Sequence, residues 1–384
     1  MTQPQSRSPT RRLVAVGALS VLAAPAQAAS SANVFVYVGT QGNEPGQGVF
    51  AARLNTTTGQ LTPLGVVAQL ARPTWIVADP KRPRLYAVSE TGNDGKTQGK
   101  VHALRADTKT GALALISSVD SGGGGPTHLA LDAGAGGLLV AHYGSGHVAA
   151  LPVRADGGAD GPRSVQLDVG SGPSPRQKSA HAHGVAIDPS GRYALVADLG
   201  ADKVFVYPYN RRTRQLAPAA ATSVSVPPGT GPRHLVFHPN GRLVFLISEL
   251  VPAIRTYEWD ARQGRMTELS VVRAGGEPPI SGAEIAVSRD GRFVYASIRG
   301  EHVIVAYAVA PKSGALTEVQ RIASRGQTPW SFRLDPSERW LLAANQGSGT
   351  VTVLKRDRAT GRLSATDQSI AVNKPTSLAI LPAR

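Results

Sequence analysis

The chain contains no cysteine. This absence excludes disulfide bonds, thiolate metal sites, a cysteine nucleophile and the attachment of a c-type haem. The G-x-S-x-G turn of serine hydrolases, the H-E-x-x-H zinc motif and the nucleotide-binding P-loop are also missing. Any chemistry must therefore come from residues that no local motif marks.

Acidic residues are few relative to basic ones: 26 Asp and Glu stand against 41 Lys and Arg, for a net charge of +15. The basic clusters, such as Lys81-Arg82 and Arg211-Arg212, fall in expected turns. We interpret them as a solvated basic surface; the alternative is attraction to anionic surfaces or substrates. Without a nucleic-acid recognition motif, we expect no nucleic-acid partner.

The first 28 residues have the pattern of a signal peptide. Arg7, Arg11 and Arg12 form a basic start, residues 13–24 are apolar, and Ala26-Gln27-Ala28 is a cleavage signature. The Arg11-Arg12 pair is similar to a twin-arginine signal. We expect a periplasmic or secreted protein with no membrane segment after cleavage; the alternative is a basic tail that is not a signal.

A motif of two short apolar strands joined by a turn recurs along the remaining chain. The first strand has a polar or proline-led start and the second ends on a polar residue, as in residues 126–132 and 138–142. The residue after the first strand recurs at intervals of 53, 56, 50, 50 and 47: Asp79, Asp132, Asp188, His238, Ser288 and Asp335. Repeats of this length made of strands are typical of β-propellers.

The repeats also predict the number of blades. Each contains a third and a fourth strand, and the turn between them often reads Thr-Gly-x-Leu, as at residues 110–113, where glycine supplies a positive φ. Six repeats are continuous, and a seventh is split between residues 375–380 and three strands within residues 34–67. We therefore predict one domain over residues 33–384. It is an all-β, seven-bladed β-propeller with four antiparallel strands per blade, closed by pairing of N-terminal strands with the C-terminal strand.

The start of each first strand and the end of each second strand meet at one mouth of a propeller's channel. Reading those positions gives candidate site residues: Trp75, Glu90, His142, His181, His183, Asp198, Arg233, His234, Glu249, Arg299 and Trp330. Cations, carboxylates and two tryptophans around one cavity favour a binding or catalytic site. The alternatives are a water-filled polar mouth and tryptophans that only plug the channel. Residues 155–180 form the longest irregular stretch and are expected to lie over one face.

Three segments resemble the seven-bladed lactonase family, which includes propeller-type 6-phosphogluconolactonases and a fungal carboxymuconate cyclase. They are residues 182–185, the Gly-Pro-Arg-His block at 231–234 with its following residues, and residues 248–250. The resemblance extends over roughly the whole of residues 33–384. It implies a site formed by one histidine, two arginines and one glutamate, which match His183, Arg233, Arg299 and Glu249.

The resemblance implies roles for these four residues. Glu249 would be the general base, Arg233 and Arg299 would hold a substrate anion and a developing oxyanion, and His183 would shuttle a proton. Alternatively, Arg233 and Glu249 are an ion pair that fixes the channel wall, and His183 is a satisfied channel histidine. The family usually has Asn where this chain has Ile298 and Ser248, and we expect Ile298 to remove an amide from the mouth.

We therefore expect a lactonase-like hydrolase that opens a sugar-type or acidic lactone without metal or cofactor, acting as a monomer on a small anionic or sugar lactone. His181 and His183 lie on one face of a strand, so metal binding is an alternative, but a third ligand is missing. The export signal argues against a phosphorylated intermediate as substrate. The alternative function is a non-catalytic exported propeller, of the YVTN-repeat type, that binds a ligand or protein partner.

Overall fold

The computed structural model describes residues 1–3, 5, 33–42, 44, 47–276 and 279–383. Apart from residues 1–3 and 5, the predicted signal peptide lies outside these ranges. Residues 31–384 form one compact unit. Within the described ranges, no helix has the length and apolar character needed to cross a membrane.

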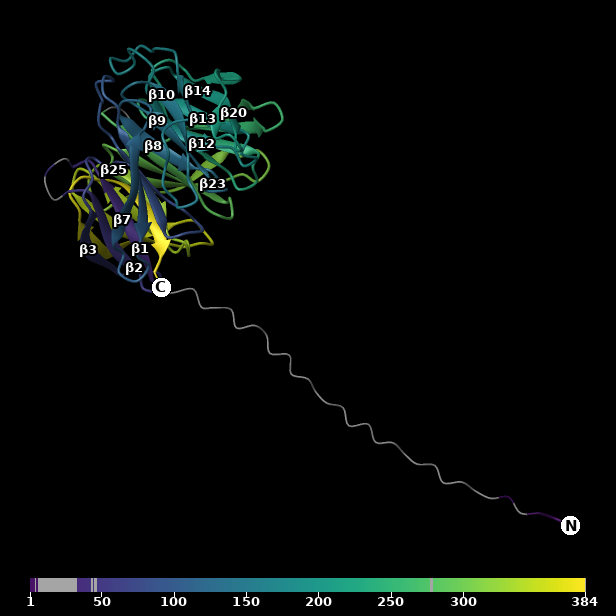
Figure 1. The fold of residues 1–384 in the computed structure, drawn as a ribbon. Helices are drawn as coiled ribbons and strands as arrows, with labels where there is room; N and C mark the ends of the chain where they lie inside the picture. Colours follow the sequence, from purple (N-terminus) through teal and green to yellow (C-terminus); the bar gives the residue numbers. More distant parts are fainter. Residues whose placement is uncertain (4, 6–32, 43, 45–46, 277–278, 384) are drawn as a thin grey trace. The chain divides into compact units, whose positions relative to one another are not determined.

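The strands form seven antiparallel sheets, which are the blades of a propeller (Figure 1), as the repeats predicted. In spatial order, blade 1 is β29 (Pro375–Pro382), β1 (Asn33–Thr40), β2 (Val49–Asn55) and β3 (Leu61–Ala68). Blade 2 is β4 (Ile76–Ala78), β5 (Arg84–Ser89), β6 (Lys100–Ala106) and β7 (Leu113–Asp120). Blade 3 is β8 (Pro126–Leu131), β9 (Gly137–His142), β10 (His147–Pro152) and β11 (Ser164–Leu167).

The remaining four blades continue in chain order. Blade 4 is β12 (Ala182–Ile187), β13 (Tyr193–Asp198) and β14 (Lys203–Asn210), which pairs with both β15 (Gln215–Leu216) and β16 (Thr222–Ser225). Blade 5 is β17 (Pro232–Phe237), β18 (Leu243–Ser248), β19 (Ala253–Asp260) and β20 (Arg265–Arg273). Blade 6 is β21 (Ser281–Val287), β22 (Phe293–Arg299), β23 (Val303–Val309) and β24 (Leu316–Ala323). Blade 7 is β25 (Pro329–Leu334), β26 (Trp340–Asn345), β27 (Thr350–Arg356) and β28 (Leu363–Ala371).

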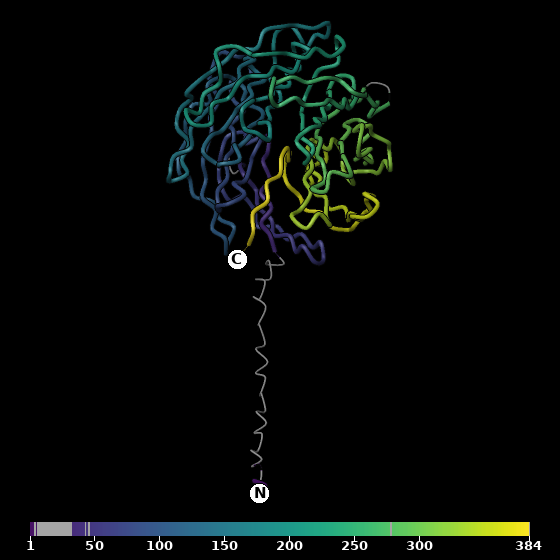
Figure 2. The backbone as a smooth tube through the Cα atoms, turned by 90° about the vertical axis from the view of Figure 1, so that its right-hand side faces the viewer, coloured from purple at the N-terminus to yellow at the C-terminus, as the bar shows by residue number. Residues whose placement is uncertain are grey.

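Blade 1 is built from both ends of the propeller's chain. The C-terminal strand β29 pairs antiparallel with β1, with Val34 opposite Pro382 and Val38 opposite Leu378. Figure 2 shows the yellow C-terminal segment beside the purple N-terminal strands. The predicted closure is therefore confirmed, and β1 has partners on both sides instead of an exposed edge.

The recurring residue after each first strand caps the turn that follows. Oδ1 of Asp188 accepts hydrogen bonds from the backbone N–H groups of Arg192 and Tyr193, each at 2.8 Å. Oγ of Ser288 and Oδ1 of Asp335 accept equivalent bonds at 3.0 and 2.8 Å. These polar residues recur because a buried turn needs an acceptor for its backbone donors.

Apolar side chains join each blade to the next. Trp340 of blade 7 packs with Leu54 of blade 1, and its Nε1 donates to the carbonyl of Thr56 at 2.9 Å. Gly59 lies beneath the indole with a φ of 80°, and a Cβ there would come within 2.6 Å of the ring. The glycine of the recurring turn is therefore required both by its backbone conformation and by inter-blade packing.

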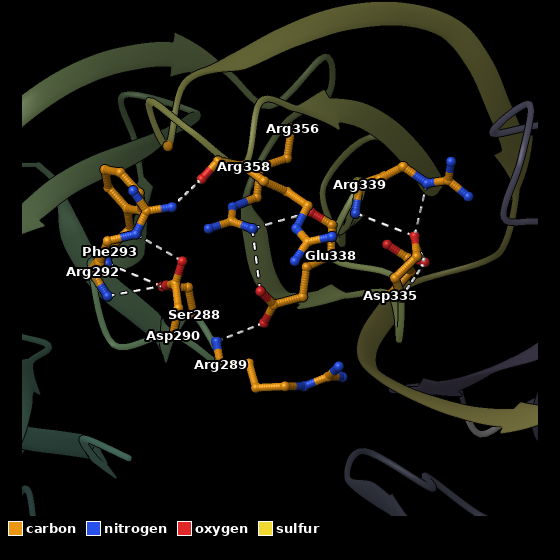
Figure 3. A network of polar contacts seen from close by, with 12 residues as sticks. Ser288, Arg289, Asp290, Arg292, Phe293, Asp335, Glu338, Arg339, Arg356 and Arg358 are labelled. Carbon is orange, nitrogen blue, oxygen red and sulfur yellow. Dashed lines mark hydrogen bonds and ion pairs between the residues drawn. The ribbon is translucent and has the colours of Figure 1, made fainter. Parts of the chain in front are cut away.

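A polar network joins blades 6 and 7 at the strand ends opposite Glu249 (Figure 3). The Arg356 side chain is fully buried, and its Nη1 contacts Oε2 of Glu338 at 3.2 Å. Its Nε donates to the Tyr295 hydroxyl at 2.6 Å. Oε1 of Glu338 accepts from the backbone N–H of Arg289 at 2.7 Å. One carboxylate thus neutralises a buried arginine and caps a turn of the neighbouring blade.

The stretch 155–180 is less irregular than predicted. It contains β11, which is the outer strand of blade 3, and β11 pairs with β10 from Ser164 to Leu167. The prediction was wrong there because β11 is short and lies among Gly and Pro residues. Residues 168–181 contain no strand, and Arg176 within them contacts Glu249.

Candidate active site

Glu249 lies at the centre of a cluster of cationic side chains. It follows β18, and only 2% of the residue is exposed. Its Oε2 lies 2.8 Å from Nε of Arg233, 3.1 Å from Nη2 of Arg299 and 3.4 Å from Nε2 of His183. The structure thus brings together the four residues that the family resemblance implied.

β-Bulges aim three of the surrounding side chains at this position. In β12 the pairing skips His183, in β17 it skips Arg233, and in β25 it skips Trp330. The extra residue of a β-bulge is not paired with the neighbouring strand, and its side chain takes a different direction. Bulges are therefore common beside active sites. Gly184 permits this crowding, because a Cβ there would lie 2.4 Å from the carbonyl oxygen of Arg233.

Trp330 supports both interior arginines. The Arg299 guanidinium lies 4.7 Å from the centroid of its ring, and the Arg233 guanidinium lies 5.9 Å from it. Attraction to the face of the ring partly offsets the repulsion between the two cations. Nη2 of Arg299 also donates to the carbonyl of Gly282 at 3.1 Å, whereas its buried Nε has no hydrogen-bond partner among the described residues.

Aromatic rings form the channel wall next to Arg233. The His234 ring lies 5.2 Å from that of His183 and 5.0 Å from that of Trp75. Nδ1 of His234 lies 3.2 Å from Oε1 of Glu284. Trp75 and Glu284 also line a cavity of about 640 Å³ that includes inner-strand residues of several blades. Of the two predicted residues, Trp75 thus lines this cavity, and His234 contacts both Trp75 and the Glu249 cluster through His183.

The ionisation of the cluster is set by burial and by its arginines. Burial favours a neutral Glu249, but Arg299, His183 and Arg233 outweigh burial and hold the pKa of this carboxyl well below its ordinary value. Burial, reinforced by Arg233, lowers the pKa of His183 to about 4. Burial and the Arg299 charge lower the pKa of Arg233 to about 10. At neutral pH the site therefore holds a carboxylate, a neutral imidazole and charged guanidinium groups.

Sequence reasoning missed Arg176 and Tyr143. Nη1 of Arg176 lies 2.6 Å from Oε1 of Glu249, and its Nη2 donates to the Tyr143 hydroxyl at 2.9 Å. The Tyr143 ring stacks on His181 with centroids 4.6 Å apart and meets His183 edge-on at 5.7 Å. The sequence indicated them only indirectly, through the expectation that residues 155–180, which include Arg176, lie over one face of the propeller.

Two candidates from the same repeat position, His142 and Glu90, contact other parts of the protein. His142 is fully buried, with Nδ1 3.0 Å from the His147 carbonyl oxygen and Nε2 3.0 Å from Oγ of Ser121. Glu90 contacts Arg72 at 3.6 Å and Asn93 at 3.1 Å. Both ring nitrogens of His142 and Oε1 of Glu90 are thus engaged with the protein, and substrate contacts by these residues stay predictions.

Asp198 supports the loop below the site. It is fully buried and accepts hydrogen bonds from the backbone N–H groups of His181 and Ala201 at 2.9 and 2.8 Å. Asp168 is a second buried carboxyl group beside Asp198. Burial and the neighbouring Asp198 charge raise the pKa of Asp168 to about 8. Asp198 thus has a structural role through Oδ1, and a contact with substrate stays a prediction.

His181 is engaged with Tyr143. Its Nδ1 lies 2.6 Å from the Tyr143 carbonyl oxygen, to which it donates. In the part of the chain that the structure describes, no three His, Cys, Asp or Glu residues are grouped so as to hold a metal ion. The alternative of a metal at His181 and His183 therefore gains no third ligand from the fold.

The departure at Ile298 does not affect the mouth, contrary to expectation. Ile298 is fully buried and packs in the apolar cluster with Ile247, Ile285 and Val305, whereas the next residue, Arg299, contacts Glu249. Successive side chains of a strand point to opposite faces. The prediction that Ile298 removes an amide from the mouth was wrong, because it assigned neighbouring residues to the same face.

A seven-bladed propeller with a buried Glu–His–Arg cluster defines the class of this protein. The family described as "Lactonase, 7-bladed beta-propeller" matches residues 35–380, and the chain belongs to this family. It is 32% identical over 348 residues to the 6-phosphogluconolactonase of Bacillus subtilis, covering 90% of this chain and 97% of that protein. It is 31% identical to the 6-phosphogluconolactonase of Formosa agariphila, covering 87% of this chain and 96% of the relative.

Among solved structures, the periplasmic gluconolactonase of Pseudomonas aeruginosa is similar throughout. The two chains are 34% identical, with a TM-score of 0.83, and the similarity covers 92% of this chain and all of that one. The resemblance inferred from three short segments is thus confirmed at the level of the family.

Proposed function

We propose that this protein is an exported lactone hydrolase whose catalytic residues are His183 and Arg299, with Glu249 and Arg233 positioning them. One observation supports this assignment most directly. Nδ1 of His183 and Nε of Arg299 are buried without hydrogen-bond partners among the described residues, although both side chains contact the same oxygen of Glu249. Buried polar atoms normally have hydrogen-bond partners, so these two atoms are available to a substrate. The acceptor Nδ1 suits an attacking water, and the donor Nε suits the oxygen of the reacting carbonyl.

The contact between His183 and Glu249 indicates the tautomer of the imidazole. An ionised carboxylate only accepts hydrogen bonds, so Nε2 of His183 carries the proton and Nδ1 carries the lone pair. A water molecule that attacks the lactone carbonyl carbon transfers a proton to Nδ1 as its oxygen forms the new bond. Glu249 stabilises the resulting imidazolium, as the carboxylate of a catalytic triad does.

Glu249 is a poor proton acceptor in this arrangement. Protonation would remove the negative charge that compensates Arg233 and Arg299, whose side chains are only 1% and 10% exposed. Uncompensated buried charges are strongly destabilising. We therefore assign the general base to His183 and an orienting role to Glu249, which reverses the roles expected from the resemblance.

Arg299 stabilises the charge that develops on the carbonyl oxygen. Its Nη2 is held by Glu249 and by the Gly282 carbonyl, so the guanidinium is fixed before substrate binds. Fixed donors are effective because they need no reorganisation during the reaction. Collapse of the intermediate breaks the ring C–O bond, and the proton returns from His183 to the leaving oxygen, which gives a hydroxy acid.

The sequence of residues 1–28 and the periplasmic relative support export, and the relatives support a sugar lactone as substrate. Purified mature protein should hydrolyse glucono-δ-lactone faster than the spontaneous reaction, and Glu249→Gln should lose most of that excess rate. Equal rates for the wild type and Glu249→Gln would contradict the proposal. Ligand binding without hydrolysis would favour the non-catalytic propeller.

A further inference from the structure

The two oxygens of Glu249 have different surroundings. Oε2 faces the interior and contacts Arg233, Arg299 and His183. Among the described residues, Oε1 has a single partner, Nη1 of Arg176, at 2.6 Å. Arg176 therefore occupies the one oxygen of the carboxylate that the interior residues leave free.

Arg176 also differs from the interior arginines in exposure. Its side chain is 47% exposed, against 1% for Arg233 and 10% for Arg299. Its remaining contacts are with Tyr143, through hydrogen bonds from Nε and Nη2 to the hydroxyl at 3.3 and 2.9 Å and a cation–π contact at 5.8 Å. The Glu249 carboxylate is buried, but about half of the Arg176 side chain is open to solvent, so the guanidinium can turn from the carboxylate toward an anion that arrives from solvent.

The loop that carries Arg176 is fixed at its base. Gln177 is fully buried, donates Nε2 to the Leu199 carbonyl at 2.8 Å, and accepts the Ser174 N–H at its Oε1 at 3.1 Å. The backbone N–H of Gly172 donates to the Gln177 carbonyl at 2.8 Å. With the backbone anchored, the change of partner is a rotation of the Arg176 side chain at the rim of the site.

We propose that Arg176 determines substrate charge: it binds an anionic substituent outside the lactone ring, a carboxylate or a phosphate, and leaves Glu249 when that anion arrives. Three guanidinium groups contact one carboxylate in this cluster, so the site carries surplus positive charge. An arginine fork matches the two oxygens of such an anion. This inference rests on the proposed hydrolysis and adds the substrate class.

The test compares a neutral lactone with two charged ones. Glucono-δ-lactone, 6-phosphoglucono-δ-lactone and glucaro-1,4-lactone, which has a free carboxylate, are assayed with the wild type, Arg176→Gln and Arg176→Lys. Lys178→Gln, an exposed lysine in the same loop, is the matched control. All rates are corrected for spontaneous hydrolysis.

The readout is the ratio of kcat/KM on each charged lactone to kcat/KM on the neutral one. Arg176→Gln should lower this ratio about tenfold or more, mainly through KM, with Arg176→Lys intermediate because it keeps charge without the fork. Lys178→Gln should leave the ratio within about twofold, as expected for a screened surface charge. The lactone whose ratio falls more identifies carboxylate or phosphate, and an unchanged ratio for both overturns the proposal.

A binding measurement separates this inference from the proposed catalysis. If no lactone is hydrolysed, calorimetry with 6-phosphogluconate, glucarate and gluconate still reports the preference for an added anion. Wild type should bind 6-phosphogluconate or glucarate more tightly than gluconate, and Arg176→Gln should lose that preference. Equal affinities for all three in the wild type would overturn the role of Arg176, whatever the outcome of the kinetic assay.

Discussion

Nε2 of His183 lies 3.4 Å from Oε2 of Glu249, and this pairing leaves Nδ1 of the imidazole as the proton acceptor of the site. The two residues belong to neighbouring blades, since His183 is the bulge residue of β12 and Glu249 follows β18. Inter-blade contact thus sets the tautomer of the proposed base.

Replacement of His183 by Gln should abolish most lactone hydrolysis. A general base contributes about 10²–10⁴-fold, so we expect kcat to fall by about that factor while KM changes little. The matched control is His181→Gln, because His181 lies two residues away and is bonded to the Tyr143 carbonyl. A His183→Gln enzyme with wild-type kcat would exclude proton transfer through this imidazole.

Stability should fall as the pH is lowered from 6.5 toward 4. Burial lowers the pKa of six histidines, to about 4 for three of them (His102, His142 and His183); the others are His128, His147 and His234. In this window the unfolded chain binds their protons and the folded chain does not, so each lowers stability by about 1.4 kcal/mol per pH unit.

Three buried acids act in the opposite direction. The pKa values of Asp168, Asp198 and Glu284 are raised, so the folded state keeps their protons and gains stability as the pH falls. Six histidines against three acids leave a net loss of stability on acidification, which thermal unfolding at pH 7, 6 and 5 would measure. His102→Gln should flatten this dependence by about 1.4 kcal/mol per pH unit, whereas an unfolding temperature that rises toward pH 5 would contradict the assignment.

Glu338→Gln should destabilise the propeller strongly. The substitution leaves the fully buried Arg356 without its carboxylate partner, which typically costs about 3 kcal/mol or more. The control is Glu318→Gln, whose partly exposed pair with Arg321 should change stability by less than about 1 kcal/mol. Urea denaturation distinguishes the two, and similar midpoints would mean that the network in Figure 3 contributes little.

Ile298→Asn should damage folding without adding an amide to the site. The position lies in the apolar cluster between strands, so the change removes buried methyl groups and buries an unpaired amide, at about 3–5 kcal/mol. Ile298→Val should cost only about 1 kcal/mol. Improved lactone hydrolysis by the Asn variant at an unchanged unfolding midpoint would show that this side chain reaches the mouth after all.

The repeat was sufficient to predict the blades because every copy carries its own turn signals, such as Asp188 and the Thr-Gly turns. It also located His183 and Arg233, which follow the same strand-start pattern. It could not separate Glu249 from His142, because these equivalent strand ends differ in partners that come from other blades, such as His183 and Arg299 for Glu249. Arg176 had no repeat position at all, and only folding places its loop over Glu249.

The pairing of β29 with β1 has a consequence for the order of assembly. The innermost strand of the first blade, β29, follows all the other strands along the sequence, so blade 1 stays incomplete until β29 has been synthesised. Contacts between residues such as Val38 and Leu378 are among the most distant along the chain, and such contacts slow folding. The ring therefore cannot close before residues 375–382 have been synthesised, and a product truncated before residue 375 would have an open edge at β1 that favours aggregation.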